Sequence, residues 1–310
     1  ADDAVDEADS AVAASKTTDE TTAKTTDKIS SKTTNDTLPL PCDSAVPRLS
    51  RIALPVCSAI GVALAAAVVW AWFPHGSAAW TNPLHEIDAP AHYYFIRKIL
   101  GEGVGAATHL WPNDEYYPPL FHLLAAGMIK LASLFGVNLS IYAAFNTVWL
   151  ATSGLVWPIA IQLYASYFTR RLSHSAQSVC SPRFANARKS SARNVASVVV
   201  PLFPAILALI IPPLAVASAS HPFQMLASGP LIAFGLAATL LPFWLYATLR
   251  LLDALATREH LVKWIIWFFV TAGVCMFAHP RIVFTWLLLM APVVLTRLPW
   301  KAIAGLAGVV

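Results

Sequence analysis

The sequence predicts an all-α protein, a multi-pass transmembrane helical bundle with a large outer loop containing interfacial helices. Hydrophobic residues make up 57% of the 310 residues and charged residues only 12%, whereas soluble domains carry roughly 25% charged residues. Several apolar runs after residue 51 are longer than the roughly 14 residues typical of a buried core helix, and they approach the ~20 residues that cross a bilayer. We therefore expect the lipid bilayer to be the protein's main environment.

The first fifty residues have a different composition. Residues 1–50 are rich in Thr, Ser, Asp and Lys and contain almost no large apolar side chains, so they cannot bury enough surface to offset the entropy of ordering. We expect a disordered cytoplasmic tail at 1–50 and a transmembrane domain at 51–310. These residues start acidic rather than basic and apolar, so we do not expect them to act as a secretory signal peptide. The final KAIAGLAGVV resembles the beginning of another span, which needs about 20 residues, so we expect the transmembrane domain to be truncated there.

Charge and cysteine usage argue against a nucleic-acid-binding protein and against a protein built on disulfides or zinc. The net charge of +4 comes from basic residues in the segments between apolar runs, where membrane orientation accounts for them, so no nucleic acid partner is expected. The four cysteines are scattered without paired spacing, which indicates neither a disulfide framework nor a zinc site.

The distribution of basic residues determines how the chain threads the membrane. Two arginines precede the first expected span, 52–73, and the segment 169–194 carries many basic residues and no acid, so both belong in the cytoplasm. Both of these segments can lie in the cytoplasm only if the apolar run 118–135 does not cross the membrane. A helix lying in the outer interface tolerates the His122 and Lys130 that this run contains.

This threading gives six complete spans and a cell-membrane protein whose N-terminus is cytoplasmic. Segment 74–138 becomes an extracytoplasmic outer loop, and segment 169–194 becomes a cytoplasmic basic loop. The spans are expected at residues 52–73, 139–168, 195–217, 226–249, 264–278 and 282–295.

The outer loop is the best candidate for chemistry. Ionisable groups next to a bilayer are costly and are rarely without function. Seven acidic residues follow Ile52, and five of these lie within thirty residues of the loop. They are Glu86, Asp88, Glu102, Asp114 and Glu115.

The sequence after Asp88 predicts a helix on the membrane surface. Asp88 is a good N-cap and the proline two residues later suits a first turn, so a helix is expected over residues 89–100. His92 and Ile96 share its apolar face, which favours an interfacial position. Asp88 is either a catalytic residue or only a helix cap, since capping alone accounts for many such aspartates. Glu86 is either a second carboxylate of the same site or a solvated loop residue.

Other polar side chains at the outer ends of helices are substrate-binding candidates. Tyr117 precedes a Pro-Pro pair at the expected headgroup level, and His122 follows one turn later, where a lone histidine is more often structural than a ligand. Arg281 is a planar cation suited to holding phosphate, or it is an anchor that reaches lipid headgroups. The expected substrate-binding residues are His92, Asp114, Glu115, Tyr117, His122, His279 and Arg281.

The order of these features resembles a known superfamily. A first span, an outer loop opening with EIDAPAHYYFIRKIL and a closing segment WPNDEYYPPLFHLL are similar to the integral-membrane GT-C glycosyltransferases. In particular, the chain resembles large actinobacterial membrane proteins of uncharacterised function that carry such a module. The resemblance implies a polyprenyl-phosphate-linked sugar as donor, a cell-envelope glycan as acceptor and a divalent cation as a possible cofactor. It also implies that Asp88 is the catalytic base or a metal-associated carboxylate and that 118–135 is a juxtamembrane helix. Glu86 is the second catalytic candidate, but its spacing of two positions from Asp88 departs from the adjacent acid pair of some members.

Two other functions stay open at this stage. Pro212 and Pro213 interrupt an expected span, and broken spans are typical of the substrate sites of transporters. A non-catalytic envelope-assembly protein with a degenerate transferase module is the third interpretation.

Overall fold

The computed structural model describes residues 46–73, 80, 89–179, 190–217 and 232–297. Every regular element within these ranges is helical, which confirms the predicted all-α class. The chain divides into two units, Ala1–Cys42 and Asp43–Val310, and all described residues belong to the second. The expected tail, 1–50, falls outside the described residues up to 45, but its last five residues are helical because α1 begins at Val46. The expected seventh span at the C-terminus also falls outside the described residues.

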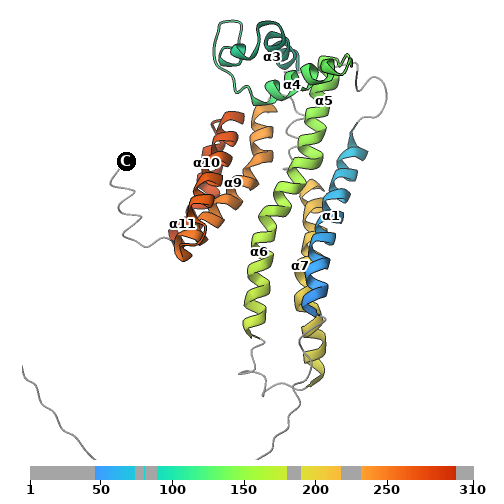
Figure 1. Cartoon of the computed structure of the whole chain (residues 1–310), viewed down its shortest axis with the longest axis vertical. Coiled ribbons are helices and arrows are strands. Elements are labelled where there is room, and N and C mark those ends of the chain that lie inside the picture. Colours follow the sequence, from blue (N-terminus) through green and yellow to red (C-terminus); the bar gives the residue numbers. More distant parts are fainter. Residues whose placement is uncertain (1–45, 74–79, 81–88, 180–189, 218–231, 298–310) are drawn as a thin grey trace, which may run out of the picture. The chain divides into compact units, whose positions relative to one another are not determined.

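Long apolar helices form most of the structure (Figure 1). α5 continues through a π-helical turn, η2, into α6, so the three form one long rod. The long elements are α1 (Val46–Trp72), α5 (Ile141–Ala151), η2 (Thr152–Val156), α6 (Trp157–Val179), α7 (Ser190–Ala217), α9 (Ile232–Thr257), α10 (Leu261–Ala278) and α11 (Ile282–Arg297). Three shorter elements precede α5: α3 (Ala89–Glu102), η1 (Val104–Thr108) and α4 (Leu120–Leu134).

Within the described residues, four helices are long and apolar enough to cross a membrane. They are Ile52–Trp72, Ile141–Arg171, Ile232–Thr257 and Leu261–Ala278. The apolar parts of α7 and α11, Leu202–Ala217 and Ile282–Arg297, are shorter. Many large apolar side chains of α1 and α10 are exposed, which is the arrangement expected of helices in contact with lipid rather than water. The chain is therefore a membrane protein.

Several helices extend beyond the expected spans. α6 continues to Val179 and α7 begins at Ser190, so the basic loop expected at 169–194 is partly helical. Hydropathy marks where side chains meet lipid, but helical hydrogen bonding continues through residues such as Arg and Ala that favour helices. α9 likewise continues to Thr257, past the expected end at 249.

α1 and the α5–α6 rod are antiparallel. Gln162 of α6 donates a 2.8 Å hydrogen bond to Ser58 near the start of α1, whereas Trp149 of α5 packs on Phe73 just after the end of α1, with ring centroids 5.5 Å apart. Residue numbers therefore rise along α1 as they fall along its partner. The chain between them must return to the side on which α1 ends, and this supports the interpretation that α4 does not cross the membrane.

α1 and α7 are parallel and pack unusually closely (Figure 1). A Cβ atom placed on Gly61 would lie 2.5 Å from the carbonyl oxygen of Ala208 and 2.9 Å from that of Leu209. Further along the same pair, Val69 and Val216 belong to one buried cluster. Small residues allow helix backbones to approach in this way in membranes, where packing rather than hydrophobic burial drives association.

The C-terminal ends of α6, α9 and α11 meet at a carboxylate. Asp253 Oδ1 accepts hydrogen bonds from Tyr167 Oη at 2.9 Å, from Arg297 Nη1 at 3.2 Å and from Arg171. Arg297 also donates to the Tyr167 hydroxyl at 2.7 Å. The order of spans expected from the sequence places these three helix ends on the same side of the membrane. Their shared hydrogen bonds to Asp253 are consistent with that expectation.

The π-helical turn η2 interrupts the longest rod. The hydroxyl groups of Thr152 and Ser153 donate to the carbonyl oxygens of Val148 and Trp149, both at 2.8 Å. Such bonding back to the preceding turn loosens the regular α-helical pattern. Gly154 follows, and a Cβ there would lie 3.2 Å from a methyl group of Val69, so the wide turn lies directly against α1.

Candidate functional site

The described part of the expected outer loop folds into a compact helical cap, defined here as residues 89–134. It comprises α3, η1, a connecting segment without regular structure, and α4. α3 packs on α4, both pack on α5, and α4 also contacts α9 and α10 (Figure 1). The cap therefore lies beside the start of the α5–α6 rod, following the connection that leaves α1.

α3 begins where the sequence predicts. Its first residue is Ala89, so Asp88 immediately precedes the helix, as the capping pattern requires. Asp88 and Glu86 themselves lie outside the described residues, and their catalytic roles remain predictions. The helix continues to Glu102 and ends at Gly103, whose φ of 88° lies in the left-handed region that glycine adopts without strain.

The buried face of α3 agrees with the expected amphipathic pattern. Phe95, Ile96 and Ile99 are buried together with His92, while Arg97 on the other side is exposed. This face forms part of the main hydrophobic cluster that includes α4, α5 and α9. The cap is thus held to the bundle by hydrocarbon packing.

Two of the expected substrate-binding histidines form a buried pair. His92 Nδ1 lies 2.9 Å from His122 Nε2, and the two ring planes are only 12° apart. The side chains are 3% and 0% exposed, so in this structure both belong to the core of the cap. Since one nitrogen must donate and the other accept, the pair joins α3 to the first turn of α4 by a single hydrogen bond.

Aromatic rings enclose the histidine pair. The His92 and His122 rings contact those of Phe95 and Tyr117, with the four centroid distances running from 5.2 Å to 5.9 Å. Burial, reinforced by the neighbouring His92, holds the pKa of His122 well below its ordinary value, against the opposite effect of the Pro118 carbonyl. Protonation inside this enclosure is disfavoured, because an apolar site penalises the charged form. The expected residues Tyr117, His92 and His122 are therefore brought together.

A tyrosine on α3 that sequence reasoning did not select lies beside this pair. The Tyr93 ring is perpendicular to the Tyr142 ring at 4.6 Å and to the Phe145 ring at 5.3 Å. Burial, with a smaller contribution from Tyr142, raises the pKa of Tyr93 to about 12. Within the described residues its buried hydroxyl has no hydrogen-bond partner. It is a donor available to a ligand or to parts of the chain outside the description.

Lys98 of α3 contacts the connecting segment between η1 and α4 at two points. Lys98 Nζ donates to the carbonyl oxygen of His109 at 2.6 Å and lies 3.4 Å from Asp114 Oδ1. Asp114 is largely exposed and has a left-handed φ of 62°, which Asp tolerates better than most residues. Glu115 is also exposed, and its carbonyl oxygen accepts a hydrogen bond from the Trp111 amide. Both expected acids thus lie at the surface of the cap, away from its buried pair.

The remaining expected pair lies at the turn between α10 and α11. His279 Nδ1 accepts a 3.3 Å hydrogen bond from the Arg281 amide, and its ring is perpendicular to that of Phe234 at 5.6 Å. Burial, followed by the nearby Arg281, lowers the pKa of His279. Arg281 is exposed. In the described part of the chain no hydrogen bond or ion pair joins these two residues to the cap.

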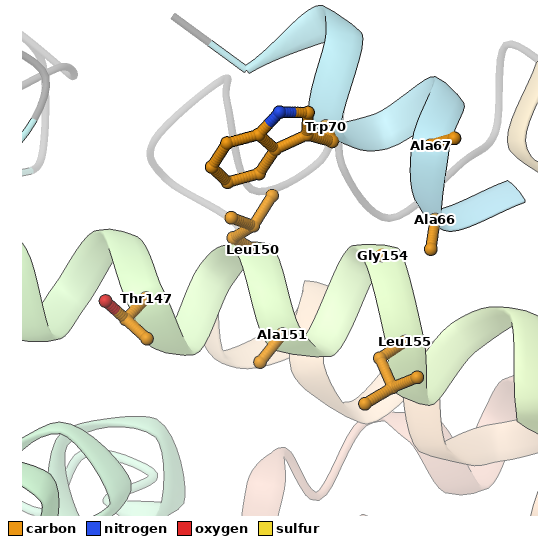
Figure 2. A pocket seen from close by; sticks show the side chains of 8 residues that line it. All are labelled: Ala66, Ala67, Trp70, Thr147, Leu150, Ala151, Gly154 and Leu155. Atoms are coloured by element: carbon orange, nitrogen blue, oxygen red, sulfur yellow. The ribbon is translucent and has the colours of Figure 1, made fainter. Parts of the chain in front are cut away.

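An apolar groove lies between α1 and the α5–η2 segment (Figure 2). It has a volume of about 440 Å³ and almost no polar surface. Figure 2 shows the Trp70 indole from α1 above Leu150. The groove is lined by Ala66, Ala67, Trp70, Thr147, Leu150, Ala151, Gly154 and Leu155. Sequence reasoning missed it, because a groove between helices depends on their pairing and no residue type marks it.

The position of the groove relates it to the cap. Trp70 precedes Phe73, which packs against Trp80 at 5.3 Å in the connection toward the cap. Ser140, the N-cap of α5, donates to the Trp80 carbonyl oxygen at 3.2 Å. The groove therefore lies in the half of α1 that leads into the segment carrying Glu86 and Asp88.

Comparison with known proteins gives a family but no activity. A family model described as a family of unknown function, DUF6541, matches residues 33–308. The chain belongs to DUF6541. No curated protein and no solved structure matches it. The match spans every described helix of this DUF6541 protein, so cap, groove and bundle all belong to the family domain.

The binding of a divalent cation stays a prediction for this DUF6541 chain. Within the described residues there is no group of three or more His, Cys, Asp or Glu side chains that could hold a metal ion. Asp88, for which the resemblance implies a metal-associated role, and Glu86 lie outside that description. The histidine pair alone offers two ligands, and its nitrogens already hydrogen-bond to each other.

Proposed function

We propose that this protein is a membrane glycosyltransferase that moves a sugar from a polyprenyl-phosphate donor to a cell-envelope glycan acceptor on the outer face. The observation that carries the proposal is an apolar groove in the half of α1 from which the chain continues to the two acids Glu86 and Asp88. The groove of Figure 2 lies in the half of α1 next to the residues that lead to the cap. A donor with a long apolar tail and a phosphate headgroup requires these two surroundings side by side.

The groove fits the lipid part of such a donor. Its lining is formed by Ala, Gly and Leu side chains and one indole, with a single threonine. An isoprenoid chain gains dispersion contacts there without leaving any polar group unpaired. Trp70 lies at the end nearer the cap, and tryptophan is favoured at the level where hydrocarbon gives way to headgroups.

The proposed reaction is a direct displacement at the sugar. The Asp88 carboxylate takes the proton of the acceptor hydroxyl, whose oxygen forms a bond to sugar carbon C1. The bond from C1 to the phosphate oxygen breaks, and its electron pair leaves with the lipid phosphate. Arg281 stabilises the charge that develops on that phosphate. If a divalent cation binds, Asp88 and Glu86 would hold it, and it would supply the same charge stabilisation.

The distribution of charge favours transfer over ion-coupled transport. Within the described spans, charged side chains occur only near the helix ends, as with Arg171, Asp253 and Lys263. Coupled transporters place ionisable groups near the bilayer midplane. The polar groups buried deeper, such as Gln162, are neutral and contact neighbouring helices.

The test is sugar transfer by the purified full chain in lipid. The substrates are a radiolabelled polyprenyl-phosphate sugar and an envelope glycan fraction, and the variant is Asp88→Asn. General-base catalysis is worth about 10²–10⁴-fold, so the variant should lose at least about a hundredfold in rate. Glu259→Gln, an exposed acid on the turn between α9 and α10, is the matched control and should keep full activity. An Asp88→Asn protein as active as the control, or wild-type protein that takes up solute without transferring sugar, contradicts the proposal.

A further inference from the structure

The turn between α9 and α10 carries a cationic cluster that the proposed function does not use. Arg258 and Lys263 are exposed, and Arg250 is partly buried about two turns before the end of α9. Trp264 lies among them at the start of α10. Basic residues are expected near span ends, but the arrangement of these side chains is more specific than an orientation signal requires.

Two cations share one indole. The Arg250 guanidinium carbon lies 4.9 Å from the centroid of the Trp264 ring, and Lys263 Nζ lies 5.2 Å from it. The Tyr246 ring is perpendicular to the indole at 5.8 Å. The negative face of an aromatic ring attracts a cation, so the indole holds two positive groups near one point even though they repel each other.

No anion balances these cations in the described part of the chain. Asp253, one turn from Arg250, is already engaged by Arg171 and Arg297. Glu259, on the turn itself, is exposed and makes no ion pair with a described residue. Arg250 Nε is buried and has no acceptor among the described groups. A buried donor on a charged group is costly when no acceptor satisfies it. A negatively charged acceptor bound at the cluster would therefore stabilise it.

The backbone of this turn is fixed in an unusual conformation. Arg258 and His260 have left-handed φ angles of 63° and 54°, a conformation that is strained for non-glycine residues. The turn is held by the Arg258 amide, which donates to the Ala254 carbonyl oxygen at 2.8 Å, and by the Trp264 amide, which donates to that of His260 at 3.2 Å. The cationic groups are therefore presented by a defined turn.

The surroundings point to a lipid. α10 is a candidate span that begins at Leu261, and its exposed side chains next to the cluster, including Val262 and Ile266, are apolar. A tryptophan at the end of a span lies at the headgroup level. The acceptors available there are phosphate oxygens of phospholipids. We propose that Arg250, Lys263 and Trp264 form a binding site for the phosphodiester headgroup of an anionic phospholipid, with its acyl chains against α10.

The experiment measures lipid binding by the full chain. Purified protein in a neutral detergent is titrated with phosphatidylglycerol, and binding is followed by native mass spectrometry and by the thermal denaturation midpoint. Each cation near an anionic headgroup contributes enough to change affinity about fivefold. Arg250→Gln/Lys263→Gln should therefore lower the apparent affinity by roughly thirtyfold. Arg250→Lys, which keeps the charge but loses the planar group, should give an intermediate loss.

The control is a pair of basic residues in the cap. Arg97→Gln/Lys130→Gln removes the same charge from two exposed positions and should leave the affinity unchanged. Lys263→Gln alone changes an exposed side chain, so it tests the site even if the Arg250 variant does not fold.

Three results would overturn the proposal. In the first, the cap variant and the site variant lose affinity equally, which would indicate general charge attraction. In the second, phosphatidylcholine binds as tightly as phosphatidylglycerol. In the third, inorganic phosphate stabilises the protein as much as the lipid does, which would make this a site for a soluble anion.

Discussion

Adding one methyl group at Gly61 should force helices α1 and α7 apart. The Cβ of alanine at this position would lie 2.5 Å from one backbone oxygen of α7 and 2.9 Å from the next. Both obstacles are main-chain atoms of a helix, so no side-chain rotation can relieve the contact. Ordinary contacts of a Cβ atom begin at about 3.4 Å, and the helices would have to separate locally by close to 1 Å.

The energetic consequence follows from the packing that such a shift loses. A radial gap of 0.5–1 Å forfeits about a quarter to a half of each dispersion contact along the interface. Overpacking of this kind typically costs about 1–3 kcal/mol. Alanine favours a helix over glycine by up to about 1 kcal/mol, which offsets part of the loss. We expect Gly61→Ala to destabilise the protein by about 1–2 kcal/mol.

The assay is equilibrium unfolding of the full chain in mixed micelles of a mild detergent and SDS. Gly273→Ala is the matched control, because Gly273 lies within α10 and a Cβ there meets no atom within 4 Å. The control should be neutral or slightly stabilising, since only helix propensity changes. If Gly61→Ala is as stable as Gly273→Ala, the close approach of α1 and α7 is refuted.

Three further predictions address the cap, the Asp253 network and the groove. His122 is buried with a lowered pKa, so the unfolded chain takes up a proton that the folded cap does not. Cap stability should therefore fall as the pH drops below the ordinary value of 6.5, and hydrogen exchange of α3 and α4 amides should show this in the wild type but less in His122→Phe. Asp253→Asn should cost about 1–2 kcal/mol in the same micellar unfolding assay, because two arginines lose a carboxylate but one of them is half exposed and screened. Ala151→Phe should fill the groove and raise the KM for the lipid-linked donor about tenfold, equivalent to ~1.4 kcal/mol, with little change for the acceptor.

Each of these has a result that contradicts it. Equal pH dependence of cap exchange in His122→Phe would mean that another group titrates. An Asp253→Asn protein as stable as Glu259→Gln would mean that the helix ends are held by apolar packing alone. An unchanged donor KM for Ala151→Phe would exclude the groove as the lipid site.

Local patterns in the sequence were sufficient for the start of α3, and they led to the prediction that α4 does not cross the membrane. The Asp-Ala-Pro step marks the start of α3 at Ala89, and the charge of segment 169–194 indicates that α4 stays on one side of the membrane. Both signals are local or additive along the chain. The observed antiparallel pairing of α1 with α6 agrees with that threading.

Contacts between distant residues could not be predicted in the same way. His92 and His122 are thirty positions apart, and each was recognised as a candidate, but nothing in the sequence indicates that their imidazoles meet. Asp253 is a single acid among basic residues, and its role depends on the convergence of three helix ends. The groove depends on the close approach of α1 to η2. Gly154 permits this approach, but the glycine alone does not predict it.

The wide turn η2 has a consequence for how the two halves of its rod are used. One additional residue in a turn rotates everything after it by about 100° relative to an uninterrupted α-helix. The half before η2 directs Phe145 toward the cap, whereas the half after it directs Gln162 toward Ser58 of α1. A single loosened turn thus lets one continuous helix serve two partners in different directions. Any substitution that tightens this turn would change the azimuth of all side chains below it, far from the altered residue.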